Sequence, residues 1–270
     1  MGSNVLVVIG VGGMGQAIAR RQGAGKTVLL ADFNEAVLQS VAAQLTGEGH
    51  NVVTQQVDVS SGPSVAALAN VAADLGAVTD VVHTAGVSPV HASTSAVLNV
   101  DLLGVALVLE EFGRVIASGG AGVVISSMAG YFAAPLDAEQ ERALATTSSG
   151  DLLDLPFVDA DADPGRSYSL AKRGNHFRVQ AASASWGARG ARINSISPGV
   201  ISTPMGQAEL AGDSGAGMRA MVAGSATRRV GTPDDIADAV AFLLGPTASF
   251  ISGTDLLVDG GAIAGVRYNR

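Results

Sequence analysis

Residues 5–15 read Val-Leu-Val-Val-Ile-Gly-Val-Gly-Gly-Met-Gly. Residues 5–9 form a continuous apolar run, which is typical of a parallel strand buried on both faces. The next six residues match the spacing G-x-G-x-x-G, and a stretch with helical spacing follows from residue 13 to about residue 21. A strand, this glycine pattern and a helix together predict a turn where the backbone approaches a pyrophosphate at the helix N-terminus. We expect a dinucleotide to contact Gly10, Gly12, Gly13, Met14 and Gly15.

The remainder of the chain alternates short apolar runs with longer helical stretches. Strands are expected at residues 27–31, 51–57, 80–83, 122–126, 191–196 and 255–258. Helices are expected at residues 35–45, 64–75, 95–118 and about 168–188, and a last one opens at residues 232–235. This alternation predicts an α/β fold of the Rossmann type, a doubly wound parallel β-sheet of about seven strands with helices on both faces, in a single domain.

Two segments depart from this alternation. Residues 134–167 carry eight acidic side chains against two arginines, so we expect an acidic insertion with two short helices. It would serve as a lid or a subunit contact, or be a solvated loop without a role. Residues 204–224 are rich in glycine, and we expect a mobile loop over the substrate there.

The composition excludes several classes of protein. Hydrophobic residues make up 47% of the 270 residues and charged residues 15%, which excludes a disordered chain. The net charge is −8, so neither nucleic acid nor an anionic membrane is an expected partner. Cysteine is absent, so we expect no disulfide, no thiolate nucleophile and no metal site. We find no apolar run long enough to span a membrane and no signal peptide, and expect a cytoplasmic protein.

Residues at the ends of the predicted strands suggest how the dinucleotide is held. Asp32 lies 22 positions after Gly10, where an acid accepts a hydrogen bond from the adenosine ribose. A carboxylate at ~4 Å from the extra phosphate of NADP would cost about 4 kcal/mol at an effective dielectric constant of about 20. The next residue is Phe33 rather than a base, so NAD is preferred over NADP, although Arg20 and Arg21 could reach outward.

The third and fourth strands end in short segments that suit the same ligand. Asp58, followed by Val59, could accept a hydrogen bond from the adenine amino group. The small residues Thr84, Ala85 and Gly86 would let the backbone lie against the cofactor. Each segment is a turn more often than a site. Their position at the carboxyl ends of parallel strands is what favours binding.

Tyr168 and Lys172 are four residues apart on a predicted helix, so they share one face. A tyrosine titrates near pH 10, too high for a base at neutral pH, but a neighbouring cation lowers its pKa. A shift of ~3 units corresponds to about 4 kcal/mol, which Lys172 and an oxidised nicotinamide could supply together. The alternative is a surface pair, but the chain has only three tyrosines and two lysines.

Taken with two further segments, Ser126-Ser-Met-Ala-Gly130 and Pro198-Gly-Val-Ile-Ser-Thr203, these motifs are similar to those of the short-chain dehydrogenase/reductase family over nearly the whole chain. The resemblance implies that Tyr168 is the general acid/base, that Lys172 lowers its pKa and binds the nicotinamide ribose, and that Ser127 binds the substrate oxygen. It also implies that Ile201 and Thr203 hold the nicotinamide carboxamide, next to Pro198 and Gly199, and that the protein is a homodimer or homotetramer.

Four features depart from the family pattern. The glycine loop is one residue shorter than usual, and His83 stands where the family has Asn, more as a packing residue than a catalyst. Asp101 stands where the family has a catalytic Asn, so it is a candidate catalytic residue whose charge would alter the proton-relay network. Ser127 and Tyr168 are separated by 41 positions, where the family often has about a dozen.

We therefore predict an NAD-dependent oxidoreductase that interconverts a secondary alcohol and a ketone. Methionines in residues 205–221 favour an apolar substrate, with ordinary loop packing as the alternative. A different class of function is a non-catalytic NAD(H)-binding sensor or scaffold, which only Asp101 favours. An epimerase or dehydratase acting on a nucleotide sugar would need a longer C-terminal substrate region.

Overall fold

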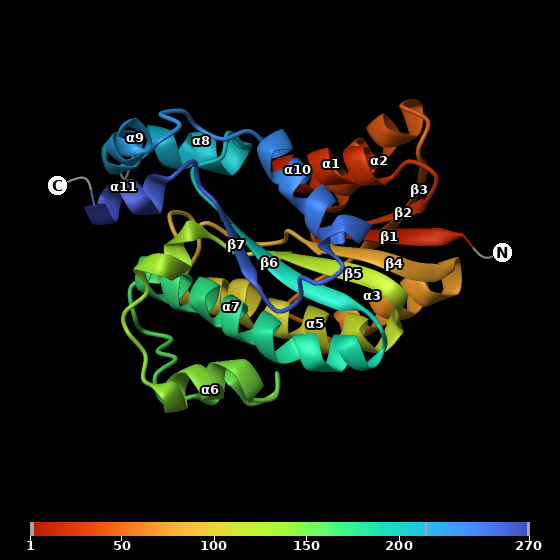
Figure 1. Ribbon diagram of the computed structural model, residues 1–270, viewed down its shortest axis with the longest axis horizontal. Coiled ribbons are helices and arrows are strands. Elements are labelled where there is room, and N and C mark those ends of the chain that lie inside the picture. Colours follow the sequence, from red (N-terminus) through yellow and green to blue (C-terminus); the bar gives the residue numbers. More distant parts are fainter. Residues whose placement is uncertain (1–2, 214, 269–270) are drawn as a thin grey trace.

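The computed structural model describes residues 3–213 and 215–268, and the strands in them form one seven-stranded sheet (Figure 1). The strands are β1 (Asn4–Ile9), β2 (Thr27–Asp32), β3 (Asn51–Gln56), β4 (Ala77–His83), β5 (Ile116–Ile125), β6 (Arg192–Pro198) and β7 (Asp255–Val258). Their order is β3-β2-β1-β4-β5-β6-β7, and each neighbouring pair is parallel. The predicted fold class is confirmed.

Helices cover both faces of this sheet, as Figure 1 shows. One face packs against α1 (Gly13–Gln22), α2 (Glu35–Gly47) and α10 (Pro233–Leu244), and the other against α3 (Gly62–Leu75), α5 (Gly104–Val115) and α7 (Pro164–Ala188). Alternate residues of β1 enter the two cores, with Val7 on the α3 side and Val8 on the α1 side. This is the reason why strands such as β1 are apolar throughout, since both of their faces are buried.

The helix expected at residues 95–118 has a different form. The chain forms α4 (Thr94–Val97), a wide π-helical turn (Leu98–Leu103) and α5, and β5 already begins at Ile116. The wide turn presents Asp101 and Leu102 to the interior, where both are fully buried. The strand therefore starts six residues earlier than expected, and the helix changes its hydrogen-bonding pattern at Asp101.

The acidic segment packs along α7, on the side away from the sheet (Figure 1). It contains α6 (Ala138–Thr146), which begins with a capping box at Asp137, and a short 3-10 turn (Leu152–Asp154). Leu144 and Leu152 join a third apolar cluster with Phe177 of α7. The segment is thus anchored by its own small core, in agreement with the two short helices expected.

The segment expected to be a loop contains two helices within its described residues, 204–213 and 215–224. Thr203 accepts a hydrogen bond from the backbone of Gly206 (3.1 Å) and starts α8 (Pro204–Ala211), and α9 (Gly215–Gly224) follows. Capping by Thr203 and proline in the first turn favour a helix in spite of the glycines. Helices α8 and α9 lie together with the C-terminal helix α11 (Ala262–Tyr268) at one end of the molecule (Figure 1).

Two features are absent from the described part of the chain. No helix within residues 3–213 and 215–268 has both the length and the apolar character needed to cross a membrane. The same residues hold no group of three or more His, Cys, Asp or Glu side chains arranged for a metal ion.

Candidate active site

The carboxyl ends of β1 and β4 meet so closely that two positions of the glycine loop have no space for a side chain. Gly10 has a φ of +90°, and a Cβ there would lie 2.4 Å from the backbone nitrogen of Ala85. A Cβ on Gly15 would lie 1.9 Å from the carbonyl oxygen of Gly10. The Thr84 hydroxyl donates a hydrogen bond to the same carbonyl (2.5 Å). Glycine is therefore required at positions 10 and 15 by neighbouring backbone.

Gly12 and Gly13 are placed differently. No atom of the described chain lies within 4 Å of the position of a Cβ on Gly12, so this part of the loop is open. Gly13 begins α1 and lies against the Thr203 side chain, where a Cβ would be 3.1 Å from Thr203 Cγ2. The open backbone of Gly12 and the unpaired N–H groups that begin a helix suit a pyrophosphate.

Asp32 has a structural role that the sequence did not reveal. Its Oδ2 accepts a hydrogen bond from the backbone N–H of Val11 (2.8 Å), and its Oδ1 accepts one from the backbone N–H of Asn34 (2.9 Å). Each carboxylate oxygen can accept a second bond, so a ribose hydroxyl can still be held there. Phe33, directly after it, has 71% of its surface exposed and contributes to no core.

The segment after β3 forms a turn of its own. Asp58 accepts hydrogen bonds from the backbone and the hydroxyl of Ser60 (2.9 and 2.6 Å). Val59 is buried, and its side chain packs against Gly104. The carboxylate of Asp58 thus stabilises this turn, whatever else it binds.

Tyr168 of α7 and Ser127 after the end of β5 line one cavity, and Lys172 of α7 lies beside the Tyr168 ring. Ser127 follows β5, and its Oγ accepts a hydrogen bond from the backbone N–H of Ala129 (3.1 Å). Lys172 Nζ lies 5.2 Å from the centroid of the Tyr168 ring. The preceding Ser126 donates to the carbonyl oxygen of Lys172 (2.9 Å), which ties the end of β5 to α7. The sequence predicted that these three side chains would meet, and they do.

A cavity of about 340 Å³ opens between these side chains and the helices α8 and α9. Met14 of the glycine loop also lines it, and so do Pro198, Gly199, Ile201 and Thr203 after β6. The candidate cofactor residues after β1 and β6 therefore border the same space as Tyr168. Its apolar lining includes five methionines, namely Met14, Met128, Met205, Met218 and Met221.

Asp101 contacts Lys172 directly. Its Oδ1 lies 2.8 Å from Lys172 Nζ, and its Oδ2 accepts a hydrogen bond from the backbone N–H of Val87 (3.2 Å). Both side chains are almost completely buried. A Cβ on Gly86 would lie 2.7 Å from Asp101 Oδ1, so Gly86 makes room for the pair.

The charges of this group act on Tyr168 in opposite directions. Burial raises the pKa of the Tyr168 phenol, Lys172 acts to lower it, and Asp101 raises it again. Burial acts against the charged form of Lys172, but Asp101 and Tyr168 outweigh this effect and raise the pKa of Lys172. Lys172 thus has the predicted influence on Tyr168, while the net pKa of the phenol lies above its ordinary value and the phenol is protonated at neutral pH.

His83 lies inside the protein, beneath the site. It is the last residue of β4 and is 1% exposed. Burial, followed by the charge of Lys172, lowers the pKa of His83 to about 3, so the ring is neutral. Within the described residues neither ring nitrogen has a hydrogen-bond partner. These properties fit the expected packing residue.

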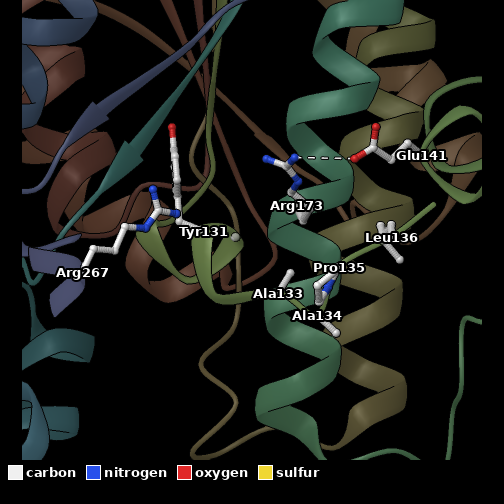
Figure 2. A pocket seen from close by; sticks show the side chains of 9 residues that line it. Tyr131, Ala133, Ala134, Pro135, Leu136, Glu141, Arg173 and Arg267 are labelled. Carbon is white, nitrogen blue, oxygen red and sulfur yellow. Dashed lines mark ion pairs between the residues drawn. The ribbon is translucent and has the colours of Figure 1, made fainter. Parts of the chain in front are cut away.

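A second cavity, which the sequence did not predict, has a volume of about 300 Å³ and lies between residues 130–136, α7 and α11. Figure 2 shows Tyr131 and Arg267 on one side of it and Arg173 with Glu141 on the other. The Tyr131 hydroxyl donates to Asp255 (2.8 Å), and Arg173 pairs with Glu141 at 3.7 Å. Burial and Asp255 raise the pKa of Tyr131, so its phenol is protonated at neutral pH.

Sequence comparison finds relatives over almost the full length. Residues 3–138 match the family model described as short chain dehydrogenase, and residues 138–262 match the one described as Enoyl-(Acyl carrier protein) reductase. A short-chain dehydrogenase/reductase of Alternaria brassicicola, bsc3, is 44% identical over 266 residues, or 98% of this chain and 97% of that protein. The cis-4-hydroxycyclohexanecarboxylate dehydrogenase of Sinomonas cyclohexanicum is 31% identical, over 96% of each chain.

Solved structures share the fold as well. One is a short-chain type dehydrogenase/reductase from Mycobacterium ulcerans, which is 25% identical to this chain. It superposes with a TM-score of 0.76 and covers 97% of this chain and 90% of that one. The similarity therefore extends over both the glycine loop and the helices that cover the cavity.

Proposed function

This chain belongs to the short-chain dehydrogenase/reductase family of oxidoreductases, and on that premise we propose that it interconverts a secondary alcohol and a ketone with NAD(H). The observation that carries the proposal is that Tyr168 and Ser127 line a cavity that the glycine loop also borders, with Lys172 buried beside the Tyr168 ring. A phenol beside a buried cation, facing a largely apolar space, suits proton transfer to or from a substrate oxygen.

The residues at the strand ends fit a nicotinamide dinucleotide. Gly12 is open where the pyrophosphate would lie, and Asp32 would accept the ribose hydroxyls and repel the phosphate of NADP. Asp58 and Val59 would flank adenine, Phe33 and the segment from Thr84 to Gly86 would border the adenosine half, and Pro198, Gly199, Ile201 and Thr203 would hold the nicotinamide. When bound, this cofactor supplies or accepts the hydride.

The side chains of the chain itself would handle the proton. In reduction, Tyr168 Oη gives its proton to the carbonyl oxygen of the substrate while Ser127 Oγ holds that oxygen in place. In oxidation, the phenolate takes the hydroxyl proton. Lys172 stabilises the phenolate and binds the nicotinamide ribose, and Asp101 keeps Lys172 charged and in position. Because burial raises the pKa of Tyr168, reduction is favoured at neutral pH and oxidation increases toward alkaline pH.

The cavity lining supports an apolar substrate. Five methionines border it, and methionine adapts to ligands of varied shape. The Sinomonas relative is named for a hydroxycyclohexane that carries a carboxylate, so it supports a ring-sized alcohol, and the apolar character rests on the cavity lining alone. As in the family resemblance, we further propose a cytoplasmic homodimer or homotetramer.

A screen of alcohols and ketones by cofactor absorbance tests the proposal, with NAD compared with NADP and the native protein with Tyr168→Phe. We expect Tyr168→Phe to lower kcat by about 10² to 10⁴ and to leave NADH binding intact. If Tyr168→Phe kept the native rate, Tyr168 would not be the acid/base.

Asp101 favours one alternative, a protein that binds NAD(H) without catalysis, because a carboxylate replaces the family's usual amide beside Lys172. Tight NADH binding, together with no turnover of any compound in the screen, would support this sensor or scaffold instead.

A further inference from the structure

The cavity above Tyr168 contains one charged side chain that the proposed reaction does not use. Among the described residues that line it, only Glu209 is charged, and the rest are apolar or small. Glu209 is in α8, four residues after Met205, so both side chains lie on the helix face that covers the cavity. In α9, Met218 and Met221 line the same space from a similar face. A single carboxylate therefore interrupts an otherwise methionine-rich cover.

The position of Glu209 is fixed by a hydrogen bond from the segment that follows β4. The hydroxyl of Ser88, which follows β4 and is 5% exposed, donates a hydrogen bond to Glu209 Oε1 (2.5 Å). Ser88 also accepts a bond from the backbone N–H of Val90 (3.2 Å), so its own position is defined. Within residues 3–213 and 215–268 no cation forms an ion pair with Glu209, and Oε2 has no hydrogen-bond partner.

The negative charge of Glu209 acts on Tyr168 across the cavity. Burial is the main influence that raises the pKa of Tyr168, and the negative charge of Glu209 adds to it. Glu209 and the reacting phenol therefore face a common space. A substrate whose oxygen lies at Tyr168 would extend its remote end toward α8.

Building on the proposed function, we propose that Glu209 determines specificity by accepting a hydrogen bond from a hydroxyl or N–H group at the remote end of an otherwise apolar substrate. A carboxylate at that end would be repelled by the like charge of Glu209. The chemical class assigned is thus an apolar, ring-sized alcohol or ketone with a neutral donor, and not an anionic one.

Three cyclohexanones that differ only at the carbon opposite the carbonyl test this assignment, namely those with a methyl, a hydroxymethyl or a carboxylate group. Binding is measured by ligand-observed NMR to the protein loaded with NAD, which has no hydride to transfer to the ketone carbonyl, and turnover is measured separately with NADH. Binding thus reports on Glu209 even where turnover fails, and a failure of turnover alone counts against the proposed function.

In the native protein we expect the hydroxymethyl compound to bind most tightly and the carboxylate at least about tenfold more weakly than the methyl compound. Glu209→Gln should strengthen binding of the carboxylate about tenfold and leave the methyl compound within about twofold. Glu209→Asp, which keeps the charge on a shorter side chain, should keep the discrimination against the carboxylate. Glu139→Gln removes one charge from exposed α6 and should change none of the three.

Equal binding of the methyl and carboxylate compounds to the native protein would overturn the proposal. So would an affinity for the carboxylate compound that stays within about twofold of the native value in Glu209→Gln, or a failure of all three ketones to bind.

Discussion

At the cofactor end, backbone atoms approach one another so closely that a single added carbon has no space, whereas at the substrate end two helices turn flexible side chains toward a cavity. A Cβ on Gly15 would lie 1.9 Å from Gly10 O, but one on Gly217 in α9 would meet no described atom within 4 Å. Few side chains can be accommodated in the glycine loop, whereas many different side chains can be accommodated on the helices that cover the cavity. A fold built in this way can keep its cofactor site while its substrate changes.

The largest effect is expected where backbone leaves no space. Gly15→Ala should weaken NADH binding more than about 100-fold and destabilise the protein by about 3 kcal/mol, because Gly10 O must move. Fluorescence titration with NADH and thermal unfolding measure the two effects. Gly47→Ala, at the end of α2 in open space, is the matched control and should be near neutral. Binding within tenfold of native in Gly15→Ala would contradict the steric role of this glycine.

A smaller effect is expected where the acidic segment is anchored. Arg178, nearly buried in α7, donates hydrogen bonds to the carbonyl oxygens of Leu144 (3.0 Å) and Thr147 (2.9 Å) and pairs with Glu110 (3.2 Å). Arg178→Met should lower the free energy of unfolding by about 2–3 kcal/mol, with NADH affinity unchanged. Chemical denaturation measures the loss, and Arg142→Met, on exposed α6, is the control. Native stability in Arg178→Met would show that the segment is held by its apolar core alone.

Between the two ends lies the buried pair of Asp101 and Lys172. Asp101→Asn removes a negative charge that raises the pKa of Tyr168, so the phenolate should form at lower pH. The rise of kcat/KM for alcohol oxidation should therefore move to lower pH, by about one unit. The pH profile at saturating NAD measures the shift. A shift to higher pH would instead mean that the main effect of Asp101 is to keep Lys172 charged.

The same contrast determines how much could be predicted from the sequence. Strands such as β1 are buried on both faces, so their apolar runs were evident, and Gly10 and Gly15 fill positions that backbone sterics impose. Tyr168 and Lys172 share a helix, so their proximity followed from their spacing alone. These features depend on local geometry, which a sequence pattern records directly.

Other features depend on contacts between distant segments. Asp101 pairs directly with Lys172 from the wide turn at residues 98–103. No pattern in the sequence predicted that turn. Glu209 was missed because its neighbours suggested a glycine-rich loop, while the cap at Thr203 makes a helix. Its spacing of four from Met205 is the signal that could have identified it once the helix was assumed.

The smallest effect is expected for Gly217→Ala in α9, one of the two helices that cover the cavity. Like Gly15→Ala, this substitution adds one methyl group to a glycine. Gly217 lies within α9, has no positive φ, and is exposed with open space around a Cβ. Gly217→Ala should therefore raise the free energy of unfolding by about 0.5–1 kcal/mol, because alanine loses less conformational entropy in a helix. NADH affinity should stay at the native value, since the substituted position is remote from the strand ends. Thermal unfolding and NADH titration measure both quantities on the same samples. A loss of stability would show that α9 needs the freedom of glycine at this position, so that the cover, like the cofactor loop, is constrained by its backbone.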